Sequence, residues 1–339
     1  MIRVGIVGAG YWGPNLLRNF ADSGDECRVV AVADLVRHRL ATLARRYPSL
    51  ELTTDAKEVL EHPGIDAVVV ATPVSTHYDL ALRALMAGKH VLVEKPLAAT
   101  AEQARHLVEE AARRGRVLMV DHTFVYTGAV RCIHQLVQSG ELGELYYYDA
   151  VRINLGTFQH DVNVIWDLAS HDLSILDLVV PGRPCAVSAT GTAHVPGRSE
   201  DIAYLTLYFD GSLIAHLHVN WLAPVKVRRT LIGGSRKMIV YDDMEASERV
   251  RVYDRGITVD DSPESVRQLQ IGYRAGDVWA PRLDVTEALA GVVSQFLSCI
   301  ASGAPSPSDG AAGLRVVELL EAASRSLLDR GRPVEVRLS

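Results

Sequence analysis

A carboxylate and an imidazole stand one helical turn apart in the stretch VIWDLASHDLSILDL. Asp167 and His171 are four positions apart, so on a helix their side chains lie on the same face and can touch. Such a pair suits general acid–base chemistry, because the carboxylate orients the imidazole and favours the charged ring that forms when it takes a proton. The pair also fits a satisfied polar contact on a buried helix, and the stretch alone does not decide between the two.

The glycines of GAGYWG follow the first predicted strand directly and open a helix. In this context a G-x-G-x-x-G string predicts a dinucleotide site: Gly8 makes the tight turn, Gly10 lets the pyrophosphate approach, and Gly13 lets the helix pack on the strand. Tyr11 and Trp12 stand inside the loop and are expected at the cofactor. Trp12 equally suits a shielding or core position.

An acidic residue, Asp34, ends the second predicted strand, 24 residues after Gly10. A carboxylate there binds the adenosine ribose hydroxyls and repels a 2′-phosphate, which favours NAD over NADP. Arg37 and Arg39 keep NADP open as the alternative, because an arginine just past this position can pair with a 2′-phosphate. Both arginines also suit a solvated helix face.

The carboxyl ends of the later strands should carry further groups at the cofactor. In ATPVSTH, Thr72, Pro73 and His77 are expected to line the nicotinamide side, although His77 also suits a helix N-terminus. Glu94 and Lys95 end the hydrophobic run HVLVEK, where an ammonium is costly unless it faces a polar cleft. We therefore expect Lys95 to point into the crevice where a hydride would be transferred.

Polar residues around the expected catalytic helix are candidates for substrate binding. Arg152 suits a diphosphate or carboxylate but equally a structural salt bridge, and Asn163 suits a helix cap. The full set of substrate-binding candidates is His122, Tyr126, Arg152, Asn154 and Asn163. His216 and His218 share one sheet face, but without a cysteine or third ligand nearby we expect no metal.

The bulk composition narrows the class of protein. The 339 residues carry a net charge of −6 and are 48% hydrophobic, which suits a soluble two-domain protein and argues against nucleic-acid or membrane partners. The four cysteines show no metal-binding or disulfide spacing. With no signal-like segment and no apolar run near the ~20 residues of a membrane span, we expect a cytoplasmic protein.

The elements that must position these groups divide the chain in two. Residues 1–122 alternate β-branched runs (2–7, 28–34, 65–72, 90–95 and 116–121) with amphipathic helices such as 77–88 and 100–115. Continuous apolar runs indicate strands buried on both faces of a parallel sheet. Repeated β-α-β units then predict a doubly wound Rossmann domain.

Residues 123–339 have a different pattern. A helix at 127–139 leads to a strand at 143–155 and the helix with His171, and several alternating strands with hairpin signals such as Asp210-Gly211 follow. Two long helices (about 284–302 and 309–330) and the segment PVEVRL close the chain. This predicts an α+β domain with a mostly antiparallel open sheet, so the fold class is α/β with a second α+β domain.

The motifs GAGYWG, Asp34, ATPxxxH, AGKHVLVEKP and DxxxHD, in this order, resemble those of the Gfo/Idh/MocA oxidoreductase family. The resemblance covers nearly the whole chain and implies an N-terminal Rossmann domain and a C-terminal domain whose open sheet builds homodimers or homotetramers. It also implies that Lys95 and His171 are catalytic, with Asp167 as the associated acid.

The finer resemblance is to members that act on nucleotide-linked or antibiotic sugars, including UDP-N-acetylglucosamine 3-dehydrogenases. It implies NAD-dependent oxidation of a ring hydroxyl of C3 type to the ketone, or the reverse. Val164, Ile165 and Trp166 stand where free-polyol members commonly carry glycines. An aminoglycoside-sugar dehydrogenase of antibiotic biosynthesis and an inositol or free-sugar dehydrogenase stay open. The alternatives outside simple dehydrogenation are a dinucleotide-sensing regulator and an oxidation-driven glycoside hydrolase.

Overall fold

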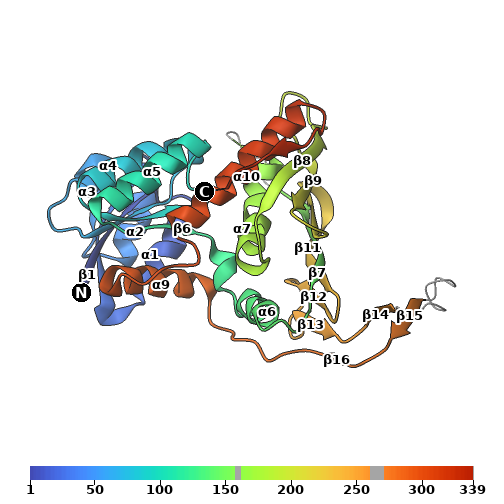
Figure 1. Cartoon of the computed structure of the whole chain (residues 1–339). Coiled ribbons are helices and arrows are strands. Elements are labelled where there is room, and N and C mark those ends of the chain that lie inside the picture. Colours follow the sequence, from blue (N-terminus) through green and yellow to red (C-terminus); the bar gives the residue numbers. More distant parts are fainter. Residues whose placement is uncertain (157–161, 260–270, 339) are drawn as a thin grey trace. The chain divides into compact units, whose positions relative to one another are not determined.

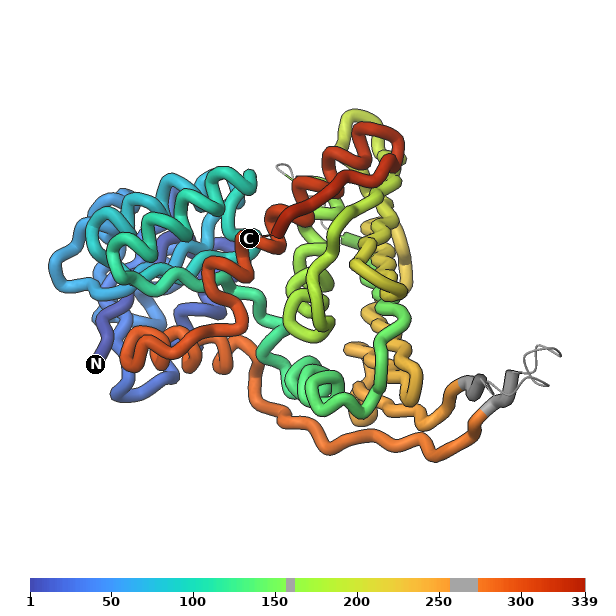
Figure 2. Tube along the Cα trace, viewed as in Figure 1, coloured from blue at the N-terminus to red at the C-terminus, as the bar shows by residue number. Residues whose placement is uncertain are grey.

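The computed structural model describes residues 1–156, 162–259 and 271–338. These residues form two compact units, one of residues 1–127 and 286–321 and the other of residues 128–285 and 322–338. Figure 2 shows the chain running from the second unit back to the first before its last two long helices. The sequence assigned all of 123–339 to the second domain, whereas 286–321 packs with the first unit.

A parallel sheet forms the centre of the first unit. Its strand order is β3-β2-β1-β4-β5-β6, and every neighbouring pair is parallel. The strands are β1 (Ile2–Val7), β2 (Cys27–Ala33), β3 (Glu51–Thr53), β4 (Ala67–Val70), β5 (His90–Glu94) and β6 (Leu118–Asp121). The predicted parallel sheet is confirmed. Only β3 lacked a prediction, because three residues are too few to show a period.

Helices cover both faces of this sheet, as Figure 1 shows for α3, α4 and α5 on one face and α1 and α9 on the other. The helices of the first unit are α1 (Gly13–Ala21), α2 (Arg37–Arg46), α3 (Ala56–Leu60), α4 (His77–Met86), α5 (Ala101–Arg114) and α9 (Ala288–Ser302). The strands between them are mostly apolar, and every residue of β4 and β6 is buried. Burial on both faces explains the continuous Val and Ala runs.

Side-chain contacts explain why α9 belongs to the first unit. Phe296 on α9 meets Phe20 on α1 edge to face, with ring centroids 6.3 Å apart. Arg18 of α1 pairs with Glu287, just before α9, at 2.6 Å. The apolar helix α9 thus packs beside α1 on the same face of the sheet, although the two lie more than 260 residues apart in the chain. No local sequence pattern predicts this contact.

The second unit is built on a nine-stranded sheet of order β16-β13-β12-β11-β7-β10-β9-β8-β17. Only β7 and β10 pair in parallel, so the predicted mostly antiparallel sheet is confirmed. The strands are β7 (Leu145–Leu155), β8 (Pro184–Thr192), β9 (Ile202–Phe209), β10 (Ile214–Asn220), β11 (Leu222–Gly234), β12 (Met238–Asp242), β13 (Val250–Tyr253), β16 (Val278–Trp279) and β17 (Val334–Glu335). A separate hairpin pairs β14 (Gly256–Val259) with β15 (Ile271–Arg274).

Helices pack on one face of this sheet: α6 (Gly128–Gln138), α7 (Ser170–Val179) and the second half of α10 (Gly310–Leu328). Alternate residues of β9, such as Leu205 and Leu207, are buried, while Tyr204 and Tyr208 on the opposite face are exposed. This alternation is expected of a sheet with one covered face. None of the helices in the described part of the chain is long and apolar enough to cross a membrane.

Candidate active site

The glycine loop of the first unit leaves no room for side chains at two of its glycines. Gly8 has φ +103°, and a Cβ there would lie 2.3 Å from the carbonyl oxygen of Ala71. A Cβ on Gly13, where α1 begins, would lie 2.0 Å from the carbonyl oxygen of Gly8. At Gly10 the space is open, and the nearest atom is a guanidinium nitrogen of Arg39 at 3.8 Å. This cradle of bare backbone at a helix N-terminus fits a pyrophosphate.

Asp34 lies at the carboxyl end of β2, directly beside the glycine loop. Its carboxylate accepts hydrogen bonds from the backbone N–H groups of Ala9 and Val36, each at 2.7 Å. Arg39 approaches the same carboxylate at 3.4 Å. Arg39 thus lies on an exposed face of its helix close to the glycine loop, and Asp34 partly balances its charge.

His77 joins the loops that follow β4 and β5. It is 1% exposed, and its Nδ1 and Nε2 lie 2.8 Å from the carbonyl oxygens of Pro96 and Thr72. His77 was expected to line the nicotinamide. Its contacts also give it a structural role, because its ring joins the loop of the cis Lys95–Pro96 bond to the loop of Thr72.

A cluster of acidic groups surrounds Lys95 at the ends of β5 and β6. The indole of Trp12 donates to Oδ2 of Asp121 at 2.8 Å, and Thr123 donates to Oδ1 at 2.8 Å. Removal from water, and then the neighbouring Asp121, raises the pKa of Glu94 well above its usual range. Burial also raises the pKa of Asp121. Both carboxyl groups are thus shifted toward their neutral forms, and Trp12 ties the glycine loop to this cluster.

His122 follows Asp121 and is 1% exposed. Neither ring nitrogen has a hydrogen-bond partner among the described residues. Burial, and then the positive charge of Lys95, lowers the pKa of His122 to about 3, so the ring stays neutral. A buried, neutral ring beside Lys95 with unused donor and acceptor capacity is suited to a ligand.

Tyr126, expected to bind substrate, makes a structural contact through its hydroxyl. Its hydroxyl lies 2.9 Å from the hydroxyl of Ser306 and 2.8 Å from that of Ser308. Burial raises the pKa of Tyr126 to about 12. The side chain thus holds the segment between α9 and α10 against the end of β6.

In the second unit, Asp167 lies in a π-helical turn, Ile165–Ala169, which runs directly into α7. Single π turns inside helices are frequent at functional sites. The indole of Trp221 donates to Oδ2 of Asp167 at 3.1 Å. His171 lies in the first turn of α7 and is partly buried.

The helix that carries His171 is fixed from both sides. Arg152 on β7 forms a bidentate pair with Asp172, with N–O distances of 2.8 and 2.9 Å, and both side chains are buried. Of the two alternatives for Arg152, the structure shows the structural salt bridge, and Asp172 is its partner. Asn163 accepts from the backbone N–H of Trp166 at 3.2 Å, as a helix cap does, and donates to Glu200 at 3.0 Å. Asn154 is partly buried near the end of β7.

Two residues of the site, Asp121 and Trp221, were not predicted from the sequence. Asp121 ends a buried strand, as Lys95 does, and this parallel could have identified it. Trp221 lies 54 residues from Asp167, and nothing local connects the two.

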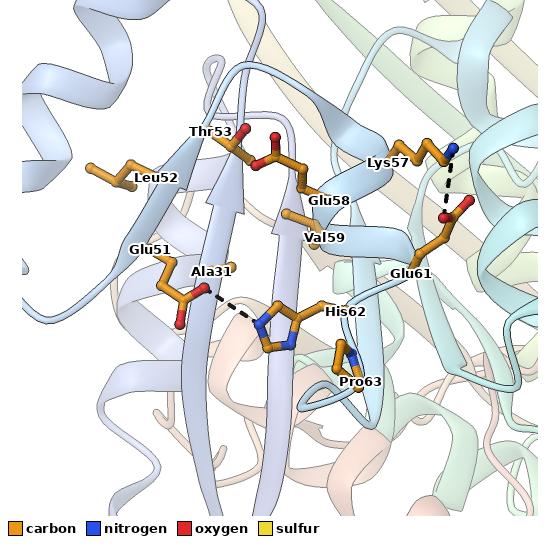
Figure 3. Close-up of a pocket in the computed structure, with 10 residues that line it drawn as sticks. All are labelled: Ala31, Glu51, Leu52, Thr53, Lys57, Glu58, Val59, Glu61, His62 and Pro63. Atoms are coloured by element: carbon orange, nitrogen blue, oxygen red, sulfur yellow. Dashed lines mark ion pairs between the residues drawn. The ribbon is translucent and has the colours of Figure 1, made fainter.

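A cavity of about 470 Å³ in the first unit is separate from all these residues (Figure 3). It is lined by residues of β2, β3 and α3 and by the loop that follows α3, with His62 paired to Glu51 at 3.4 Å and Lys57 to Glu61 at 3.8 Å. No group of three or more His, Cys, Asp or Glu in the described parts of the chain is placed to hold a metal ion.

The parallel order 3-2-1-4-5-6, with a glycine loop at the first strand and an acidic residue ending the second, defines a dinucleotide-binding Rossmann domain. Residues 2–122 match the oxidoreductase family with an NAD-binding Rossmann fold, and residues 130–240 match the GFO/IDH/MocA C-terminal domain. The chain therefore belongs to the Gfo/Idh/MocA family and is an oxidoreductase with an NAD-binding domain, as the sequence motifs predicted.

The similar proteins within the family are named for different substrates. The chain is 31% identical to dTDP-3,4-didehydro-2,6-dideoxy-alpha-D-glucose 3-reductase of Saccharopolyspora spinosa, over 71% of this chain and 74% of that protein. It is 28% identical to UDP-N-acetylglucosamine 3-dehydrogenase of Acidithiobacillus ferrooxidans, over 93% and 94%. A structure of that enzyme matches with a TM-score of 0.76 at 26% identity, covering 96% of this chain and 97% of that one. The chain is also 28% identical to scyllo-inositol 2-dehydrogenase (NADP(+)) of Bacillus subtilis, over 96% and 93%.

Proposed function

We propose that this protein is a sugar or polyol dehydrogenase that uses NAD to interconvert a secondary alcohol and a ketone at carbon 3 of a nucleotide-linked sugar. The observation that carries the substrate class is the pair of similar enzymes whose names specify carbon 3 of a nucleotide-linked sugar. The absence of glycines at Val164, Ile165 and Trp166 supports the same choice over a free polyol.

His171 is the proposed base. Oxidation removes the hydroxyl proton while hydride leaves the same carbon, and a neutral imidazole is suited to take that proton near pH 7. Asp167, one turn earlier, orients the ring and stabilises the imidazolium. In reduction the imidazolium returns the proton to the oxygen.

Lys95 is proposed to donate to the substrate oxygen and to stabilise the developing alkoxide. The raised pKa of Glu94 supports this role, because burial disfavours a negative charge on this neighbour of Lys95. The neutral ring of His122 beside Lys95 is proposed to bind a sugar hydroxyl. A nicotinamide dinucleotide, with its pyrophosphate held at the glycine loop, would supply or accept the hydride.

The cofactor preference is proposed to be NAD over NADP, because Asp34 is placed to repel a 2′-phosphate. Arg39 at 3.4 Å from Asp34 offers the compensating charge that NADP needs. Asp34→Ser should therefore lower kcat/KM for NAD and raise it for NADP, each on the order of tenfold, the size of one charged hydrogen bond. Arg39→Ser should lower the NADP rate alone. An unchanged ratio of the two rates in Asp34→Ser would contradict the assignment.

The decisive experiment follows reduced cofactor by absorbance with the purified protein. The substrates are UDP- and dTDP-sugars, free polyols including inositols, and aminoglycosides, each tested with NAD and with NADP. Turnover of a nucleotide-linked sugar that disappears in His171→Asn supports the proposal. Turnover only of an inositol supports the second candidate, which the similarity to scyllo-inositol 2-dehydrogenase favours. Cofactor reduction with none of these classes would contradict both.

We also propose that a second copy of the chain covers the open face of the second unit's sheet. Tyr204 and Tyr208 on β9 and Ile214 on β10 are exposed there, and the ring of His218 stacks on Tyr204 with centroids 4.4 Å apart. A charge in this apolar patch should separate the copies. Tyr208→Glu should halve the mass found by light scattering, and an unchanged mass would contradict this interface.

A further inference from the structure

Trp221 lies between β10 and β11 and is 1% exposed. Its one polar side-chain atom, Nε1, donates to Oδ2 of Asp167 at 3.1 Å. Buried indole N–H groups need a hydrogen-bond partner, and this one is the carboxylate expected to orient His171.

The indole ring is held in place by its neighbours. The backbone N–H of Trp221 donates to the carbonyl of Asp201, and its carbonyl accepts from Gly156, both at 2.9 Å. A Cβ on Gly156 would lie 2.3 Å from Cδ1 of the ring. Gly156 therefore leaves the space that the ring fills, and the backbone on both sides fixes the direction of its N–H.

Asp201 is itself locked into a loop that also grips the π-helical turn. It is fully buried and accepts from the backbone N–H of His194 at 2.7 Å and from that residue's Nδ1 at 2.8 Å. Next to it, Glu200 accepts from the backbone N–H of Val164 at 3.1 Å and from the side chain of Asn163 at 3.0 Å. One loop thus supports both Trp221 and the start of the turn that carries Asp167.

A donor fixed on one carboxylate oxygen has two consequences for the histidine that the carboxylate serves. It restricts rotation of the carboxylate, so the direction of the other oxygen is set. It also draws negative charge toward the indole, which weakens the pull of the carboxylate on the imidazole proton.

We propose that Trp221 is a positioning residue that orients Asp167 and tunes His171 through it. The proposal rests on the proposed function, since it takes Asp167 and His171 as the acid–base pair. It assigns no contact between Trp221 and the substrate.

The test is an NMR titration of the His171 ring in the full-length protein, with its signal assigned by comparison with His171→Asn. Trp221→Phe removes the N–H but keeps an aromatic ring, and should raise the pKa of His171 by a few tenths to about one unit. Asp167→Asn should lower the pKa, because the negative charge is lost. Combining both changes should give the value of Asp167→Asn alone.

Trp166→Phe is the matched control, because its indole donates to Ser324 at 2.9 Å in the same unit but not to Asp167. It should leave the pKa of His171 unchanged. Should Trp221→Phe fail to fold, replacing Trp221 with 3-benzothienylalanine keeps the ring shape without the N–H and should give the same upward shift.

The outcomes separate the two proposals. If Asp167→Asn moves the pKa of His171 and removal of the Trp221 N–H does not, the positioning role is overturned and the acid–base pair stands. If the two changes act additively, Trp221 does not act through Asp167 and the role is likewise overturned. If Asp167→Asn has no effect, the catalytic pair itself fails, and the positioning role fails with it.

Discussion

The cofactor end of the first unit and the helix of the second that carries His171 are built by different means. At the glycine loop the ligand-facing surface is backbone, and Gly8 and Gly13 serve by having no side chain. On the helix the proposed chemistry belongs to the side chains of Asp167 and His171. Trp221 donates to Asp167, and Arg152 fixes the helix through Asp172. A backbone site is specified by a local motif, whereas a side-chain site needs a surrounding shell from distant segments.

The largest effects are expected from replacing the proposed base, His171, and the proposed alkoxide-stabilising residue, Lys95. His171→Asn and Lys95→Ala should each lower kcat by on the order of 10²–10⁴, while the affinity for NADH, measured by fluorescence titration, stays the same in His171→Asn. Wild-type turnover in His171→Asn at every pH would show that the second unit supplies no base.

The buried contacts around the helix that carries His171 should be a major source of stability. Arg152→Met leaves Asp172 buried without its partner and should lower the free energy of unfolding by about 3–5 kcal/mol, measured by urea denaturation. The matched control is Arg183→Met, which breaks a half-exposed pair with Asp177 (2.6 Å) and should cost about 1 kcal/mol or less. Equal losses in the two variants would remove the distinction between a buried shell and a surface pair.

At the glycine loop, the backbone should be the sensitive part. Gly8→Ala should lower the free energy of unfolding by about 3 kcal/mol and abolish NADH binding, because a strained φ adds to a clash with Ala71. Gly24→Ala is the control: its φ is +59° but its Cβ would meet nothing within 4 Å, so only the smaller conformational cost of about 1–2 kcal/mol applies. A binding-competent Gly8→Ala protein would show that the loop tolerates a side chain.

His122 belongs to the first unit, yet its protonation depends on burial of a side chain and not on the backbone. It therefore tests how far the two units differ. Its folded pKa of about 3 lies below that of an unfolded histidine, near 6.5. Between these values the unfolded chain binds more protons, so His122 makes stability fall as the pH is lowered, by up to about 1.4 kcal/mol per pH unit.

His122→Gln should therefore flatten the acid side of the stability profile, measured by urea denaturation at several pH values. The raised pKa values of Glu94 and Asp121 act in the opposite direction, so the quantity to compare is the difference between wild type and variant. Parallel profiles would mean that the ring is protonated in the folded protein.

Local patterns were enough to predict the sheet of the first unit and the segments of the second. The β-branched runs, the glycine loop and the dyad of Asp167 and His171 are each contained in a short window, where period and spacing report backbone conformation directly. The same reasoning placed Lys95 and Glu94 at the end of a buried strand. It missed β3, and it left the roles of Arg152 and Asn163 undecided.

What the tertiary structure alone decided is which distant groups meet. Trp221 reaches Asp167 across 54 residues, Arg152 meets Asp172 across 20, and α9 packs on α1 from the other end of the chain. Sequence spacing carries information only about neighbours on one helix or strand. Partners across a sheet or between layers are selected by packing and by the need of each buried polar group for a hydrogen bond, and both act only once the chain has folded.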